Sequence, residues 1–251
     1  MTIISIPSLY KNYIWLLLNK SKHCVIIDPG DANITLKVLN NLQLTPDAIL
    51  LTHHHQDHVG GVFNIIKKYS NIPVYGPQET IKKGTTHIVT NNKKFKINGR
   101  NYITISVPGH TLGHVAFYSA PYLFCGDTLF SAGCGKILEG TAKQMYNSLQ
   151  KIKKLPYNTL IYCSHEYTLE NLKFAHTILP KNNYIKIYKK YVEFLRKKNK
   201  PTLPTNLKLE LKINLFLRCH DYNLQYQLGF NSPQKKLYLV FSKLRIKKDQ
   251  F

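Results

Sequence analysis

The chain has 251 residues, of which 43% are hydrophobic and 19% charged, and its formal net charge is +22. This length fits one large domain or two small ones, and the hydrophobic content excludes a disordered chain. The apolar burst at residues 14–18 is too short for a signal peptide or a membrane span, so we predict a cytoplasmic protein without a membrane partner.

Residues 1–165 alternate short apolar runs with Gly, Pro or Asp, which is the pattern of strands in an α/β protein. The predicted strands are NYIWLLL (12–18), HCVIIDPG (23–30), DAILL (47–51), PVYG (73–76), YITISV (102–107), HVAFYS (114–119) and YLFCGD (122–127). Several of these segments contain or are followed by an imidazole or carboxylate side chain, so the ends of the strands are candidate positions for a functional site.

The segment LTHHHQDHVGG, residues 51–61, has the densest group of such side chains. His53 and His55 cannot share a helical face, because two residues advance about 200° around an α-helix. In an extended segment, residues two apart project to the same side, so His53, His55 and Asp57 can converge, with His58 following at a turn. Imidazole with carboxylate suits zinc and related metals. The alternative for this segment alone is a solvated loop without a ligand.

Three later strands end in the same way, at His110, Asp127 and His165. A single histidine after a strand is more often structural than a ligand. Strand ends that all deliver His or Asp, however, bring these groups to one edge of a sheet, where ligands bind in α/β folds. The donors now number seven, which is too many for one tetrahedral ion but fits two ions with a bridging carboxylate and a bridging water.

After His165 the periodicity becomes helical. One predicted helix stops at Pro180 and a second stops before Pro201, and Ser232 with Pro233 supplies the N-cap and first residue of a last helix. We therefore predict two domains, an α/β domain over residues 1–165 and a helical domain over residues 166–251. Arg245 and Lys248 are three residues apart on the last helix and share a face.

Cysteine use argues against a disulfide-linked secreted protein, and the kind of positive charge argues against a nucleic-acid-binding protein. The five cysteines are an odd number and contain no C-x-x-C pair, which favours free thiols in a reducing compartment. The positive charge is almost all lysine, scattered in doublets, and the sequence is poor in the interleaved arginine and aromatic residues that nucleic-acid recognition favours. We predict no nucleic-acid partner and read the charge as compositional.

Five motifs together carry a resemblance to a known family. They are T-H-x-H-x-D-H at 52–58, P-G-H-T-x-G-H at 108–114, G-D at 126–127, SHEYT at 164–168 and NLFLR at 214–218. The chain resembles the metallo-β-lactamase superfamily and, within it, the glyoxalase II or hydroxyacylglutathione hydrolase family. Segments DPGD (28–31), YGPQET (75–80), GDTLFSAGCGKILEGTA (126–142), HEYTLENLKFA (165–175) and LRIKKDQF (244–251) extend the resemblance over the whole chain.

The resemblance implies the fold and the metal ligands. The fold is an αββα sandwich followed by a small all-α C-terminal domain. One ion would be bound by His53, His55 and His110, and the other by Asp57, His58 and His165, with Asp127 as the bridge. The cofactor would be two divalent ions per chain, zinc being expected and iron or manganese compatible with the same ligands.

The resemblance also implies the reaction. The substrate would be an S-(2-hydroxyacyl)glutathione, chiefly S-D-lactoylglutathione, cleaved to D-lactate and glutathione by a metal-bridging hydroxide in the second step of methylglyoxal detoxification. Asp57 would orient that hydroxide as the catalytic residue. Lys136, Tyr167, Arg245 and Lys248 would bind the glutathione part, and we expect a monomer.

Two departures and two alternatives remain at this stage. Leu138 stands where some family members have an aromatic residue, and Lys136 stands where others have arginine, which concerns substrate contacts and leaves the metal ligands alone. A persulfide dioxygenase with one iron would share the fold, but the helical tail is not expected in it. A nuclease-type or RNA-binding protein would use the positive charge instead of a pocket.

Overall fold

The computed structural model describes residues 2–251, which form two compact units. The first unit runs to Ser106 and also includes Gly113–Gly126, and the second contains Val107–Leu112 and Asp127–Phe251. The chain therefore passes between the units more than once, and each is described by itself.

The first unit contains a mixed sheet in the strand order β1-β2-β3-β4-β5-β6. The first three strands are antiparallel and the last four are parallel neighbours. These strands are β1 (Thr2–Ser8), β2 (Asn12–Leu18), β3 (His23–Ile27), β4 (Thr45–Leu50), β5 (Val74–Gly76) and β6 (His87–Ile88). The predicted apolar runs at 12–18, 23–30, 47–51 and 73–76 are confirmed as strands.

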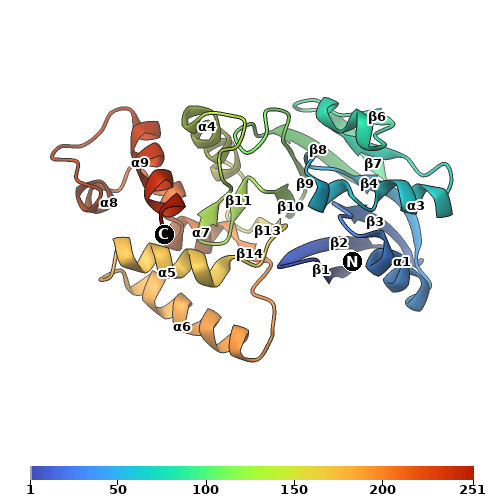
Figure 1. Ribbon diagram of the computed structural model, residues 1–251, viewed down its shortest axis with the longest axis horizontal. Helices are drawn as coiled ribbons and strands as arrows, with labels where there is room; N and C mark the ends of the chain where they lie inside the picture. Colours follow the sequence, from blue (N-terminus) through green and yellow to red (C-terminus); the bar gives the residue numbers. More distant parts are fainter. Residues whose placement is uncertain (1) are drawn as a thin grey trace. The chain divides into compact units, whose positions relative to one another are not determined.

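Helices cover one face of this sheet (Figure 1). α1 (Ala32–Asn41) and α3 (Val62–Lys68) bury Leu39, Val62 and Ile65 against strand residues such as Ile26 and Ile49. The unit also contains the one-turn α2 (Gln56–Val59) and the 3₁₀ helix η1 (Gln78–Lys83). β2 and β3 are buried along nearly their whole length, so both faces of these strands are covered.

The other face of the mixed sheet packs on an antiparallel sheet of β10, β9, β8 and β7. Their bounds are β7 (Lys94–Ile97), β8 (Arg100–Ser106), β9 (Val115–Ser119) and β10 (Tyr122–Gly126). Tyr75 on β5 stacks on Phe95 on β7 with ring centroids 4.5 Å apart, which joins the two sheets through an aromatic contact. The first unit thus consists of a helix layer and two sheet layers.

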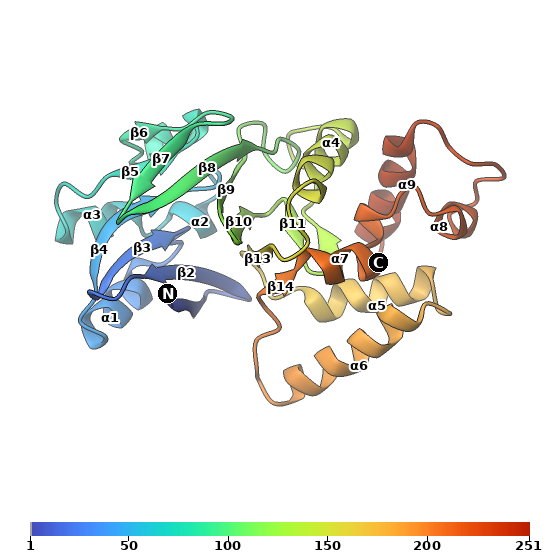
Figure 2. The same cartoon turned by 180° about the vertical axis from the view of Figure 1, so that it is seen from behind.

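The second unit is mainly helical (Figures 1 and 2). Its helices are α4 (Ala142–Lys153), α5 (Thr168–Ile178), α6 (Asn183–Lys197), α7 (Leu207–Ile213), η2 (Leu215–Leu217), α8 (Tyr222–Gln227) and α9 (Leu237–Asp249). Its strands are β11 (Leu129–Phe130) paired with β12 (Gly133–Cys134), and β13 (Leu160–Cys163) paired with β14 (Thr205–Asn206). α5 and α6 lie side by side, as do α4 and α9.

Local sequence explains most helix ends in this unit. Thr141 and Gln144 form a capping box at the start of α4, with the Thr141 Oγ1 accepting from Gln144 N at 3.2 Å. The side-chain oxygens of Asn182 and Asp221 accept from backbone N–H groups in the first turns of α6 and α8. The helices predicted to stop at Pro180 and before Pro201 are confirmed as α5 and α6.

The predicted start of the last helix is wrong. α9 begins at Leu237 with Lys236 as its N-cap residue, and Ser232 and Pro233 precede it. The Gln234 backbone N–H donates to Gln225 Oε1 on α8 at 2.8 Å, which holds this stretch outside the helix. A contact to another element therefore overrides the Ser-Pro start signal.

Candidate metal centre and substrate cavity

Four of the seven predicted metal ligands lie together in the first unit, directly after β4. His53 Nε2 and His55 Nδ1 are 3.0 Å apart, and the rings of His53 and His58 have centroids 4.1 Å apart. Asp57 Oδ2 lies 3.6 Å from His58 Nε2. Asp57 sits on the one-turn helix α2 and is not in an extended segment as predicted, because Gln56–Val59 completes a helical turn. His58 lies on the same turn, in agreement with its predicted position.

Hydrogen bonds orient these imidazoles. His58 Nδ1 lies 3.0 Å from Asp28 Oδ2, and His53 Nδ1 lies 3.0 Å from Thr52 Oγ1, which itself donates to Asp28 at 2.7 Å. Such contacts leave Nε2 of each ring as the nitrogen that would face an ion. Asp28 is therefore a functional residue that the sequence analysis did not assign, and its place in the DPGD motif was the available signal.

Close packing of the backbone also fixes this loop. A Cβ at Gly30 would lie 1.9 Å from the carbonyl oxygen of Asp57, so the DPGD segment packs against the loop where only glycine fits. Asn12 Nδ2 donates to Asp57 Oδ2 at 2.9 Å, so β2 supplies a second orienting contact. Two further histidines contact this loop: His54 Nδ1 lies 3.3 Å from Glu79 Oε1, and the His114 ring stacks on the His53 ring with centroids 4.5 Å apart.

The other three predicted ligands lie together in the second unit. Asp127 Oδ2 is 3.5 Å from His110 Nε2 and 3.2 Å from His165 Nε2, so one carboxylate oxygen faces two imidazole nitrogens. All three residues are buried. His110 Nδ1 donates to the Lys136 backbone carbonyl at 2.8 Å, which again leaves Nε2 toward the carboxylate.

A cavity of about 310 Å³ in the second unit begins at these ligands. Its lining combines predicted ligands, aromatic side chains and cations: His110, Asp127, Phe130, Cys134, Gly135, Lys136, Leu138, Tyr167, Glu170, Asn171, Arg245 and Lys248. The structure thus brings all four predicted substrate-binding residues to one cavity. Sequence analysis did not assign Phe130, Glu170 or Asn171, which carry no chemical signature of their own.

Arg245 and Lys248 share the face of α9 that lines this cavity, as their spacing predicts. Arg245 is only 5% exposed, and it donates to the Cys134 carbonyl at 3.0 Å and pairs with Asp249 at 2.9 Å. Burial, and then the nearby Arg245 charge, lower the pKa of Lys248 to about 8. Both side chains therefore present positive charge in a partly desolvated place.

Tyr167 lies beside the predicted ligand His165. The two rings stack with centroids 4.8 Å apart and an interplanar angle of 2°, and Phe130 meets Tyr167 edge-on at 5.3 Å. Burial raises the pKa of the Cys134 thiol to about 11, so this thiol is a poor nucleophile despite its place in the cavity wall.

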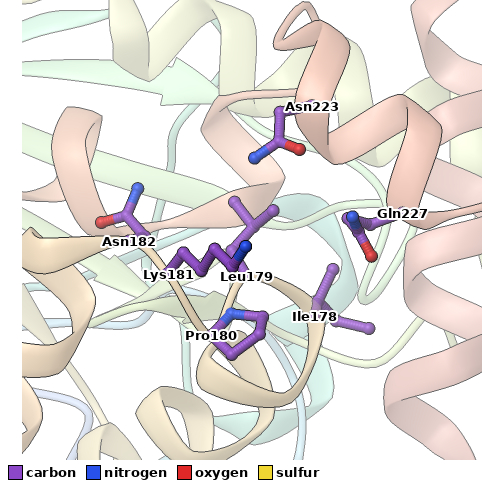
Figure 3. A pocket seen from close by; sticks show the side chains of 7 residues that line it. All are labelled: Ile178, Leu179, Pro180, Lys181, Asn182, Asn223 and Gln227. Atoms are coloured by element: carbon purple, nitrogen blue, oxygen red, sulfur yellow. The ribbon is translucent and has the colours of Figure 1, made fainter.

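A different cavity of about 380 Å³ lies between the end of α5 and α8 (Figure 3). Its lining is Ile178, Leu179, Pro180, Lys181, Asn182, Asn223 and Gln227. These lining residues include no imidazole, thiol or carboxylate group, so this cavity has no donors for a transition metal and no general base.

Comparisons with known proteins agree on a family. Residues 166–251 match the family described as hydroxyacylglutathione hydrolase C-terminus, and residues 10–97 and 93–165 match the metallo-beta-lactamase superfamily. The hydroxyacylglutathione hydrolase of Serratia proteamaculans is 61% identical, and that of Yersinia pestis is 58% identical, each over the full length of both chains. The chain belongs to the hydroxyacylglutathione hydrolase family.

Solved structures agree with this family assignment at the level of fold. A B3 metallo-beta-lactamase is 27% identical, with a TM-score of 0.67 over 86% of this chain and 99% of that one. ETHE1 from Myxococcus xanthus is 19% identical, with the same TM-score over 99% of this chain and 98% of that one. The predicted metallo-β-lactamase fold with a helical C-terminal region is confirmed. As a member of this family, the protein is an enzyme. Its clustered His and Asp side chains suit divalent metals.

Proposed function

We propose that this protein hydrolyses S-(2-hydroxyacyl)glutathione thioesters, chiefly S-D-lactoylglutathione, to D-lactate and glutathione. One observation of the structure carries the proposal. Predicted metal ligands, His110 and Asp127, line the same cavity as the cations Lys136, Arg245 and Lys248. Such a cavity can hold an acyl group at the ligands and the carboxylates of a tripeptide at the cations. The reaction would be the second step of methylglyoxal detoxification.

We further propose that the seven donors hold two divalent ions. His53, His55 and His110 would bind one ion, and Asp57, His58 and His165 the other, with Asp127 between them. The chemistry of the donor set fits zinc, and iron or manganese is compatible with it. The hydrogen bonds that fix ring nitrogens of His53, His58 and His110 support this set of ligands. Bound ions would lower the pKa of water and polarise the thioester carbonyl.

Residues of this chain would orient the reactants. The Asp57 carboxylate, whose Oδ2 accepts a hydrogen bond from Asn12, would accept a hydrogen bond from the attacking water. Tyr167, stacked on His165, would limit the positions that the acyl group can take. Attack on the thioester carbon breaks the C–S bond and releases glutathione as the thiolate, so no serine or cysteine nucleophile is required.

The tripeptide part would be bound by residues of the helical segment. We keep residues 166–251 as the proposed substrate-binding domain and residues 1–165 as the proposed metal-binding domain. Arg245 and Lys248 would hold a glutathione carboxylate, with Lys136 contributing from the turn after β12. A cation in a partly desolvated cavity interacts more strongly with a carboxylate than one on the surface.

A thiol-release assay tests the function. Purified protein reconstituted with zinc should release free thiol from S-D-lactoylglutathione, with oxygen uptake on glutathione persulfide and cleavage of RNA measured as controls. Thiol release without either control activity is the expected result. Oxygen uptake without hydrolysis would favour a dioxygenase, and RNA cleavage without hydrolysis would favour a nuclease.

The predicted partners and location stay predictions. We expect a monomer that meets only a small glutathione thioester and works in the cytoplasm. Within residues 2–251 no helix has both the length and the apolar character that a membrane crossing requires. All five cysteines are free and buried.

A further inference from the structure

A buried carboxylate outside the predicted site supports the wall of the substrate cavity. Glu210 on α7 is fully buried and accepts four hydrogen bonds. Two come from the tip of the β11–β12 hairpin, from Ser131 Oγ at 2.8 Å and from Ala132 N at 2.8 Å. The others come from Thr205 Oγ1 at 2.9 Å and Asn214 Nδ2 at 3.1 Å. A fully buried carboxylate needs such donors, since burial alone raises its pKa and disfavours its charge.

The hairpin tip depends on this carboxylate. Ala132 has a φ of 56°, a left-handed conformation that costs a non-glycine residue free energy. Two asparagines complete the support: Asn214 donates to the carbonyls of Phe130 and Gly133, and Asn171 donates to the carbonyl of Ser131. The tip is therefore held by buried side chains from α5 and α7, because a two-residue strand pair has few backbone bonds of its own.

The hairpin in turn holds two residues of the proposed reaction. The Cys134 carbonyl accepts from Arg245 at 3.0 Å, and the Lys136 carbonyl accepts from His110 Nδ1 at 2.8 Å. Gly135 packs so closely on Asp127 that an added Cβ would lie 1.9 Å from the Asp127 carbonyl oxygen. A shift of the hairpin would therefore move the acceptors that fix one proposed metal ligand and one proposed substrate-binding cation.

We propose that Glu210 is a positioning residue for the hydrolase, which acts by holding the β11–β12 hairpin under Arg245 and His110. The proposal rests on the proposed function for its kinetic consequence. Its structural part, that Glu210 holds the hairpin, stands on the contacts of the second unit alone.

Two variants, Glu210→Ala and Glu210→Gln, separate the effect of the hydrogen bonds from the effect of the charge. Glu210→Ala removes all four acceptor contacts, so KM for S-D-lactoylglutathione should rise about ten-fold, with kcat per bound metal ion within a few-fold. Glu210→Gln can turn its amide oxygen to the two N–H donors and its amide nitrogen to the two hydroxyls, which can accept. KM of Glu210→Gln should therefore stay within about two-fold of the wild type.

Cysteine trapping gives a readout that needs no substrate. The reaction of Cys134 with a maleimide, followed by mass spectrometry, should be faster in Glu210→Ala than in the wild type. Cys24, buried in β3 of the first unit, should react at an unchanged rate. If the wild type does not hydrolyse the thioester, the proposed function fails, while trapping of Cys134 still decides whether Glu210 holds the hairpin.

Asp221→Asn is the matched control, because Asp221 caps α8 in the same unit and pairs with Arg218, and neither residue belongs to the β11–β12 hairpin. Each variant is assayed at the same interval below its own Tm. The control should lower Tm without changing KM or the reactivity of Cys134. If Glu210→Ala does not fold, Ser131→Ala should show the same two changes at smaller size. Unchanged KM or unchanged Cys134 reactivity in the folded variant would overturn the proposal.

Discussion

At the scale of single residues, three of the predicted histidine ligands share one feature, which is a hydrogen-bond partner at Nδ1. His58 is held by Asp28, His53 by Thr52, and His110 by the Lys136 carbonyl. Each partner fixes the ring and its tautomer, which a metal ligand requires and a solvated histidine does not. The sequence predicted these histidines as ligands, because histidines at strand ends stand out, but it did not predict their partners.

Asp127 is the residue whose loss should affect both ions. Asp127→Ala should lower hydrolysis by more than about a hundredfold, because even outer partners of a metal ligand matter about 10- to 100-fold. Elemental analysis should find about two ions in the wild type and fewer in the variant. Asp47→Asn, at the His23 contact, serves as the control and should keep its metal. A fully active wild type with a single ion would contradict the binuclear proposal.

Lys248 should make substrate binding depend on pH. Its pKa is lowered to about 8, so it carries charge below that pH and loses it as the pH rises. If it binds a carboxylate, KM should rise between pH 7 and 9 in the wild type, and Lys248→Arg should abolish this rise.

Loss of the charge-assisted contact in Lys248→Ala should raise KM about ten- to 150-fold at pH 7, with kcat within a few-fold.

Arg245→Ala should raise KM by a similar factor and also raise the pKa of Lys248, since the Arg245 charge is one cause of its lowering. Lys67→Ala on α3, an exposed site in the first unit, is the control and should change neither constant. A KM unchanged in both cavity variants would show that α9 does not hold the tripeptide.

At the scale of elements, strands were more predictable than helix starts. Apolar runs between turn residues identified β2, β3, β5, β9 and β10, because their side chains enter the core on both faces. The start of α9 was not predictable, since it depends on the Gln234 contact with Gln225 on another helix. The Thr141 capping box was a readable signal for α4 that was not used. Glu210 could not be assigned, because its hairpin partners lie 78 and 79 residues away in sequence.

The β11–β12 hairpin offers a steric prediction. Gly135→Ala would place a Cβ 1.9 Å from the Asp127 carbonyl oxygen and 3.4 Å from His110 Nδ1, so the backbone would have to move at two proposed ligands. We expect destabilisation of about 1–3 kcal/mol and reduced metal content, measured by urea denaturation and elemental analysis. Gly99→Asn, at a turn with open space and a φ of 77°, is the control because asparagine tolerates this conformation. Full metal content in Gly135→Ala would contradict the packing argument.

At the scale of the whole molecule, the charge of +22 is the feature most open to over-interpretation. A charge of this size attracts polyanions over long distances, but its effect is screened by salt. The cavity, by contrast, is lined by few cations, of which Arg245 is buried and Lys136 is exposed. Under the proposed function, substrate recognition would depend on these cavity cations and not on the overall charge.

Binding to nucleic acid should reflect the overall charge alone. We expect weak binding to duplex DNA and RNA, with affinity that falls steeply between 50 and 200 mM salt, and no cleavage. Fluorescence anisotropy at several salt concentrations measures this, with a scrambled sequence of the same length as the comparison. Tight binding that distinguishes the two sequences at physiological salt would contradict the compositional interpretation of the charge.

The contact between Arg245 and Cys134 joins residues 111 positions apart, and it has a consequence for synthesis on the ribosome. The first unit has all of its strands once Gly126 has emerged, so it can begin to fold while translation continues. The hairpin at residues 129–134 must wait for α7 to bring Glu210 and then for α9 to bring Arg245. A nascent chain could thus hold a folded first unit well before it can bind substrate, and premature termination before α9 would yield a chain with its cavity wall incomplete.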